Sequence, residues 1–197
     1  RYINLTSAYA QKLPIKDESC DAAIMNGVLE WVGEFSKNDS VLTSQKKALK
    51  EVYRILRKGG VFYLGIENRE GLKYLLGAPE DHSSIPYISL LSRTDANDVS
   101  QSINHKPYRT HTYNKKGYLD LLKNVGFSKI EFYAALPDYK LPKVFFKNDL
   151  EIERYLSRNL SLALAKTKES EWFMTQNLLD KGSYHQFSNS FVMVSYK

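Results

Sequence analysis

The fold is decided by two stretches of this chain, DAAIMNGVLEW at residues 21–31 and KGGVFYLGIEN at residues 58–68. Each contains a short apolar run bounded by polar residues, at 21–26 and 61–66. Such runs are typical of strands that are buried on both faces of a parallel sheet. Between them, residues 44–56 place apolar side chains at helical spacing. The order strand, helix, strand with short connections predicts a βαβ unit.

Further elements are predicted on either side of this unit. They are strands at residues 2–5, 128–135 and 190–196, and helices at 114–126 and within 148–182. Gly59 and Gly60 are expected to end the first helix by supplying left-handed backbone. Asn114 is expected to cap the next helix, and Asn148 with Glu151 resembles a capping box. The polar segment at 69–113 is too long for a simple connector, so we expect a functional lid or a partly helical segment.

Composition limits the class of protein. A length of 197 residues with 43% hydrophobic residues suits one folded domain over residues 1–197. No apolar run approaches the ~20 residues that cross a bilayer, so we expect no membrane span and a cytoplasmic location. The net charge of +6 is spread along the chain, which argues against a nucleic-acid interface. The single cysteine, Cys20, excludes an internal disulfide.

Taken in order, the motifs of residues 21–31 and 58–68 resemble those of class I S-adenosylmethionine-dependent methyltransferases, of the methyltransferase type 11 kind. The resemblance implies an α/β fold with a Rossmann-like sheet ordered 3-2-1-4-5-7-6 and an antiparallel last strand. Strands three to seven would lie at residues 2–5, 22–26, 61–66, 128–135 and 190–196. The helices at 148–182 would be an insertion before the last strand.

The family's glycine-rich loop and its first two strands have no counterpart in these 197 residues. We therefore expect an N-terminally truncated domain that begins at a boundary within a larger protein. Without strands one and two, the strand at 2–5 would lack its neighbour in the sheet. An unpaired strand exposes backbone donors and acceptors. We expect it to be displaced, paired with another chain, or paired with a missing N-terminal piece.

The resemblance also implies S-adenosylmethionine as the cofactor. The matching positions are Ala10, Asn26, Gly27 and Val28, which would border its adenine and methionine parts. The acidic residue that the family often has before the position of Ala10 is replaced by Tyr9. The cofactor site is therefore expected to be incomplete in this chain.

Candidates for the acceptor site lie at the end of the strand at 61–66 and in the segment at 69–113. His82 is the first choice for a general base, with Asp81 beside it, because the ordinary pKa of histidine lies near neutrality. A surface loop histidine is the alternative interpretation of His82. The residues expected to bind the acceptor are Glu67, Asn68, Arg69, Arg109 and Tyr113. Surface ion pairs are the alternative for the two arginines, and the spacing of the four histidines predicts no metal site.

The leading hypothesis is methyl transfer to a small-molecule or glycan-related acceptor, for which this fragment alone is expected to be insufficient. The alternative is a non-catalytic, methyltransferase-like module that binds a protein partner through residues 148–182. Either the unpaired strand at 2–5 or these helices would allow a homo-oligomer. An RNA-binding methyltransferase would require an affinity for nucleic acid that depends strongly on salt.

Overall fold

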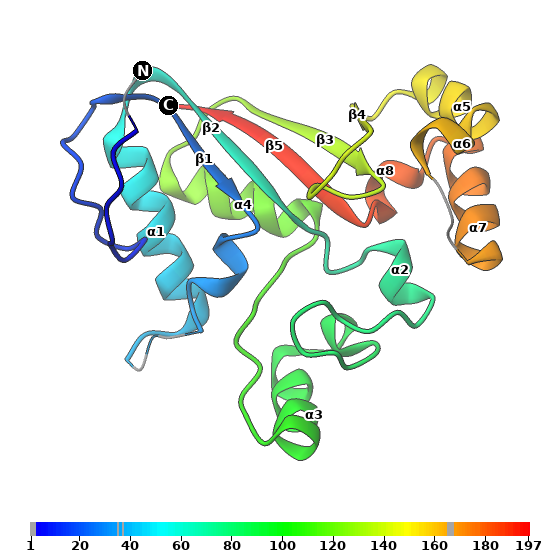
Figure 1. The fold of residues 1–197 in the computed structure, drawn as a ribbon, viewed down its shortest axis with the longest axis horizontal. Coiled ribbons are helices and arrows are strands. Elements are labelled where there is room, and N and C mark those ends of the chain that lie inside the picture. Colours follow the sequence, from blue (N-terminus) through cyan, green and yellow to red (C-terminus); the bar gives the residue numbers. More distant parts are fainter. Residues whose placement is uncertain (1–2, 35, 37, 165–167) are drawn as a thin grey trace.

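A computed structural model describes residues 3–34, 36, 38–164 and 168–197 (Figure 1). Its strands are β1 (Cys20–Asn26), β2 (Leu56–Glu67), β3 (Ile130–Leu136), β4 (Val144–Phe146) and β5 (Ser190–Tyr196). Its helices are α1 (Val41–Ile55), α2 (Leu72–Leu75), α3 (Arg93–Asn104), α4 (Lys115–Val125), α5 (Leu150–Arg158), α6 (Leu160–Ala163), α7 (Glu169–Asp180) and α8 (Tyr184–Phe187). Two 3₁₀ turns, η1 (Leu29–Trp31) and η2 (Ile88–Leu90), complete the list. Every helix among the described residues is too short or too polar to cross a membrane.

The strands form one open sheet in the order β1-β2-β5-β3-β4. β1 and β2 are parallel and are joined through α1, as a parallel pair requires. β5 runs antiparallel to both of its neighbours, β2 and β3. The four strands predicted at 22–26, 61–66, 190–196 and 128–135 are therefore present in the predicted order. The partial α/β sheet and its antiparallel last strand are confirmed.

Two helices cover one face of this sheet. Alternate side chains of β2, including Phe62 and Leu64, meet Leu49 of α1 and Leu122 of α4 in the largest apolar core. A second core lies at the far end of the sheet, where α5, α6, α7 and α8 pack beyond β4 (Figure 1). The segment at 69–113 is partly helical and hangs below the carboxyl end of β2, carrying α2 and α3.

The helix ends refine the sequence predictions. α4 is capped as expected, because the Asn114 side chain accepts from the Gly117 backbone N–H at 3.0 Å, and Gly126 follows the helix with φ 124°. α5 is capped by Asp149 rather than Asn148, since the Asp149 carboxylate accepts two backbone N–H groups of the first turn. The capping box predicted at Asn148 is therefore wrong by one residue.

The prediction that Gly59 and Gly60 end the first helix is also wrong. α1 ends at Ile55, because Leu56 already has extended backbone and pairs with Cys20 in the sheet. Both glycines lie within β2, and Gly59 has a positive φ of 74°.

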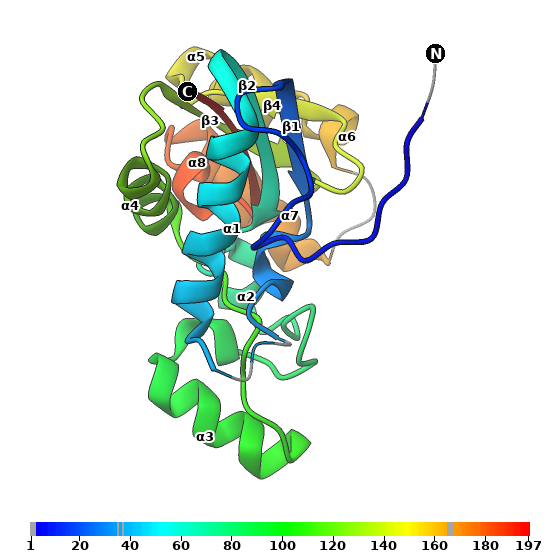
Figure 2. The same cartoon turned by 90° about the vertical axis from the view of Figure 1, so that its left-hand side faces the viewer.

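The amino-terminal part of the sheet differs most from expectation. Residues 3–8 form no strand and run away from the sheet (Figure 2), while Tyr2 lies outside the described residues. β1 was expected to be buried on both faces, but Ile24 at its centre is 73% exposed. β1 is an edge strand whose only partner among the described residues is β2, and the face of β1 that carries Ile24 is exposed.

Candidate functional site

The carboxyl end of β2 carries Glu67, whose side chain points into the protein and is 2% exposed. The Tyr139 hydroxyl donates to its Oε1 at 3.1 Å, and the Lys140 ammonium lies 3.2 Å from the same oxygen. Both partners follow β3. The second oxygen, Oε2, is buried and has no hydrogen-bond partner among the described residues. Glu67 is thus held on one side and unsatisfied on the other.

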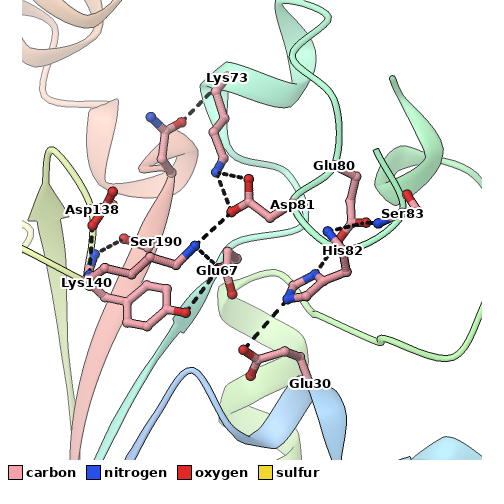
Figure 3. A network of polar contacts seen from close by, with 12 residues as sticks. Glu30, Glu67, Lys73, Glu80, Asp81, His82, Ser83, Asp138, Lys140 and Ser190 are labelled. Atoms are coloured by element: carbon pink, nitrogen blue, oxygen red, sulfur yellow. Dashed lines mark hydrogen bonds and ion pairs between the residues drawn. The ribbon is translucent and has the colours of Figure 1, made fainter. Parts of the chain in front are cut away.

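The loop after α2 brings His82 toward Glu67 (Figure 3). Its Nδ1 lies 2.6 Å from Glu80 Oε1. The other oxygen of Glu80 accepts the backbone N–H groups of His82 at 3.1 Å and Ser83 at 2.7 Å. Glu80 is 2% exposed and the His82 side chain 5% exposed. The backbone of this loop therefore holds the Glu80 carboxylate in place, and the carboxylate orients the imidazole through its Nδ1 atom.

The short turn η1 adds the third carboxylate. Glu30 is 1% exposed, and its Oε1 lies 3.8 Å from His82 Nε2, an ion-pair distance rather than a hydrogen bond. Trp31 packs edge-on against the imidazole, with ring centroids 4.7 Å apart. We call Glu30, Glu67, Glu80 and His82 the buried cluster (Figure 3). It joins η1, the end of β2 and the loop after α2.

The buried cluster has strongly altered electrostatics. Burial disfavours the charged imidazole, but the Glu30 and Glu80 carboxylates outweigh burial and raise the pKa of His82 to about 10. Burial and the nearby charge of Glu30 raise the pKa of Glu67. Burial acts in the same direction on Glu80, yet its bonds with His82 and Ser83 leave the pKa of Glu80 below its ordinary value. His82 in this arrangement holds its proton at neutral pH, which argues against the base role expected from the sequence.

Asp81 points away from His82 even though the two are adjacent in sequence. Its carboxylate lies 2.9 Å from the Lys73 ammonium and 3.3 Å from the Lys140 ammonium, and its side chain is 28% exposed. Glu80 was not predicted as the partner of His82. The two residues are two positions apart in the turn after Pro79, and their side chains meet there.

Asn68 and Arg69 bind the protein's own backbone. The Asn68 amide donates to the carbonyls of Gln186 and Ser188, both at 2.9 Å. The Arg69 guanidinium donates to the carbonyl of Ser89 at 2.9 Å and to that of Leu91 at 2.7 Å. These contacts fix the strand end and the segment after it.

Arg109 and Tyr113 are used in the same way. The Arg109 guanidinium donates to the carbonyl of Gly33 at 2.9 Å, and the Tyr113 hydroxyl donates to Gln45 Oε1 at 2.7 Å. The structure therefore does not bring Arg69 and Arg109 together as an anion clamp.

An open hollow lies beside the buried cluster, on the side of β1. Its lining residues are Ala8, Tyr9, Ala10, Gln11, Val28, Trp31, Val32, Ser36, Asp39 and Lys47. Ala10 and Val28, two of the residues matched to cofactor contacts, thus line one hollow. Asn26 and Gly27, the other two, are not among its lining residues. Trp31 belongs to both places, because it lines the hollow and packs against His82.

Gly27 lies against Tyr139 instead, and Asn26 lies against Gly65 of the neighbouring strand. A side chain at Gly27 would meet the Tyr139 hydroxyl, since an added Cβ would lie 2.5 Å from it. A Cβ on Gly65 would collide with Asn26 Oδ1 and would lie 3.0 Å from the Tyr139 ring. The two glycines thus let Tyr139 approach the strand ends, from which it reaches Glu67.

Comparison with known proteins gives one family match. Residues 1–64 match the family model described as "Methyltransferase domain". No curated protein matches the chain.

Two solved structures that are similar to this chain are described as methyltransferases. One is a S-adenosylmethionine-dependent methyltransferase from Thermotoga maritima, a possible histamine N-methyltransferase, at 20% identity and a TM-score of 0.47, covering 95% of this chain and 60% of that one. Another is phosphoethanolamine N-methyltransferase 2 of Haemonchus contortus, at 15% identity and a TM-score of 0.40, covering 95% and 35%. The chain thus spans less than two thirds of either protein.

Proposed function

We propose that this chain, which belongs to the methyltransferase domain family over residues 1–64, serves methyl transfer from S-adenosylmethionine to a small-molecule or glycan-related acceptor. One observation carries the proposal. The hollow lined by Ala10 and Val28 adjoins the buried cluster at the carboxyl edge of β1 and β2, with Trp31 between them. In open α/β sheets, ligands bind at this edge.

The chemistry needs few groups, because the methyl carbon of a sulfonium is already activated toward attack. The protein must align the acceptor in line with the methyl group and exclude water. We assign the hollow to the cofactor and the buried cluster to the acceptor. The three carboxylates of Glu30, Glu67 and Glu80 suit an acceptor that is positively charged or that loses a proton during the reaction, because their negative charge attracts a cation or a proton. A base is needed only for an acceptor atom that carries a proton.

A calorimetric titration of S-adenosylmethionine tests the proposal. We would titrate this chain and, where the natural protein extends beyond residues 1–197, that longer form. Binding by either form, followed by transfer of labelled methyl to sugars, amines or carboxylates, is the expected outcome. Binding by neither form would overturn the proposal.

The second candidate function is a non-catalytic module that binds a protein partner. The observation in its favour is the apolar surface of the helices at 148–182. Tyr155 is 61% exposed, Leu162 65% and Phe173 60%. The same surface, or the unpaired amino-terminal segment, would serve a homo-oligomer. Sedimentation of the chain with and without Tyr155→Glu and Phe173→Glu tests self-association. If neither this chain nor the longer form binds S-adenosylmethionine, the non-catalytic function is favoured.

A further inference from the structure

We propose that Glu30, Glu67 and His82 bind a divalent transition-metal cation, with Glu80 as the residue that positions His82. Each of the three side chains offers one ligand atom, and these atoms all lie within 4.8 Å of one another. They come from η1, the end of β2 and the loop after α2, so the fold rather than a local motif assembles them (Figure 3). The spacing of the four histidines predicts no metal site, and it could not reveal this one, because only one histidine takes part in it.

The spacing approaches that of an occupied metal site. Carboxylate oxygens and imidazole nitrogens bind such ions at about 2.0–2.2 Å, so two ligands of one tetrahedral ion lie about 3.3–3.6 Å apart. The three ligand atoms, all within 4.8 Å of one another, would therefore have to close by at most about 1.5 Å. His82 Nε2 and Glu30 Oε1, at 3.8 Å, are already near this spacing.

The imidazole is oriented as metal-bound histidines are. A ligating histidine usually donates its second ring N–H to a carboxylate, which fixes the tautomer and the ring orientation. Here Nδ1 lies 2.6 Å from Glu80 Oε1, and two backbone N–H groups hold the other oxygen of Glu80. Nε2 is thereby turned toward Glu30, and a bound cation would replace the proton that Nε2 carries, which is released to solvent. Glu80 supplies the outer contact without being a ligand itself.

The unsatisfied carboxylate oxygens are an independent observation. Glu30 Oε2 and Glu67 Oε2 are both buried and have no hydrogen-bond partner among the described residues. Burying a charged group without a partner is costly, so native proteins rarely leave one in this state. A cation bound by the two carboxylates would supply the positive charge that these buried groups lack. Lys140 and Tyr139 reach only the opposite oxygen of Glu67.

The donor set indicates which kind of cation fits. One imidazole with two carboxylates suits Mn²⁺, Fe²⁺ or Zn²⁺, whereas Ca²⁺ prefers oxygen ligands alone. Three protein ligands leave coordination positions open, as in catalytic rather than structural metal sites. In a role that rests on the proposed function, those positions would take an oxygen or nitrogen atom of the methyl acceptor. Cation binding itself does not depend on that role.

The test is a calorimetric titration of the chelator-treated chain with MnCl₂, ZnCl₂ and CaCl₂, without S-adenosylmethionine or acceptor. We expect one Mn²⁺ or Zn²⁺ per chain and at least tenfold weaker Ca²⁺ binding. Glu30→Gln and Glu67→Gln should each weaken binding at least tenfold. Glu80→Gln should weaken it about 10–100-fold through the orientation of His82.

Asp81→Asn is the matched control, because Asp81 neighbours His82 in sequence but faces Lys73 and Lys140. Its affinity should equal that of the unchanged chain. Circular dichroism of each variant separates lost binding from lost folding, and only folded variants are scored. Equal binding by the folded cluster variants, or no binding by the unchanged chain, would overturn the inference. Mn²⁺ binding by this chain, together with no binding of S-adenosylmethionine by either form of the protein, would overturn the proposed function alone.

Discussion

The buried cluster and the open hollow lie side by side but are built in opposite ways. In the cluster, Glu67 is 2% exposed and Glu80 is held by its own loop's backbone. In the hollow, Val28 is 41% exposed and Tyr9 80% exposed. The side chains of the cluster are buried inside the protein, whereas the hollow is open to solvent. The two regions should therefore respond differently to substitution. Changes in the buried cluster should lower the free energy of unfolding, whereas changes in the hollow should lower the affinity for a ligand.

The largest expected effect is that of Glu80→Ala in the buried cluster. It leaves a buried imidazolium without its orienting carboxylate and the His82 and Ser83 N–H groups without an acceptor. Breaking a buried charge pair in this way typically costs about 3–5 kcal/mol. Urea unfolding followed by circular dichroism would measure the loss. Asp81→Ala, which removes two more exposed ion pairs, with Lys73 and Lys140, should cost less, about 1–2 kcal/mol. Equal losses would show that the cluster is no more tightly built than its surroundings.

The next effect tests the boundary between the two regions. Gly65→Ala places a methyl group against Asn26 Oδ1 and the Tyr139 ring, and should cost about 1–3 kcal/mol through overpacking. Adding Asn26→Ala removes one of the two collisions, so the double variant should recover part of the stability. A double variant that is less stable than Gly65→Ala would contradict this packing model. Chemical denaturation of both variants gives the comparison.

The sequence could predict the frame of the molecule but only part of the site. Apolar runs and the glycine-bounded connections predict the strands at 22–26 and 61–66, because buried strands need that pattern wherever they lie. The exposure of Ile24 could not be predicted, since it depends on what covers the sheet edge.

Within the site, the sequence identified Glu67 and His82 but missed Glu30 and Glu80. Glu67 could be predicted because it follows an apolar run that marks the end of a strand. Glu30 lies in a 3₁₀ turn and Glu80 in a loop, and the sequence does not show that these segments turn the two carboxylates inward. Arg69 and Arg109 have the residue type of an anion clamp, but each guanidinium is occupied by backbone carbonyls. Residue type alone does not distinguish these two uses of arginine.

The third prediction concerns His185 of α8, whose titration should make the stability of the protein depend on pH. Burial and the nearby Lys115 ammonium, 3.2 Å from its Nδ1, lower the pKa of His185 to about 4. The unfolded chain takes up this proton near the ordinary value of 6.5, so acid favours unfolding. The stability contribution is complete above that value and is lost as the pH falls toward 4.

Between pH 7 and pH 5 the expected loss is somewhat under about 2 kcal/mol, at about 1.4 kcal/mol for each pKa unit. His185→Gln should remove this share of the pH dependence, whereas His105→Asn, at an exposed position, should keep it. Thermal unfolding at a series of pH values would measure both. If His185→Gln leaves the slope unchanged, the acid sensitivity has another source.

The smallest effect on stability is expected in the hollow, where Val28→Arg tests the other side of the comparison. An exposed side chain that makes few contacts tolerates substitution, so the free energy of unfolding should change by no more than about 0.5 kcal/mol. The arginine would nevertheless occupy the space assigned to the cofactor, and the affinity of the longer form for S-adenosylmethionine should fall at least tenfold. Ile103→Arg, at a 57% exposed position of α3, is the matched control and should change neither quantity. Unchanged affinity in a folded Val28→Arg protein would place the cofactor elsewhere, whereas a large loss of stability would show that the hollow is part of the packed structure.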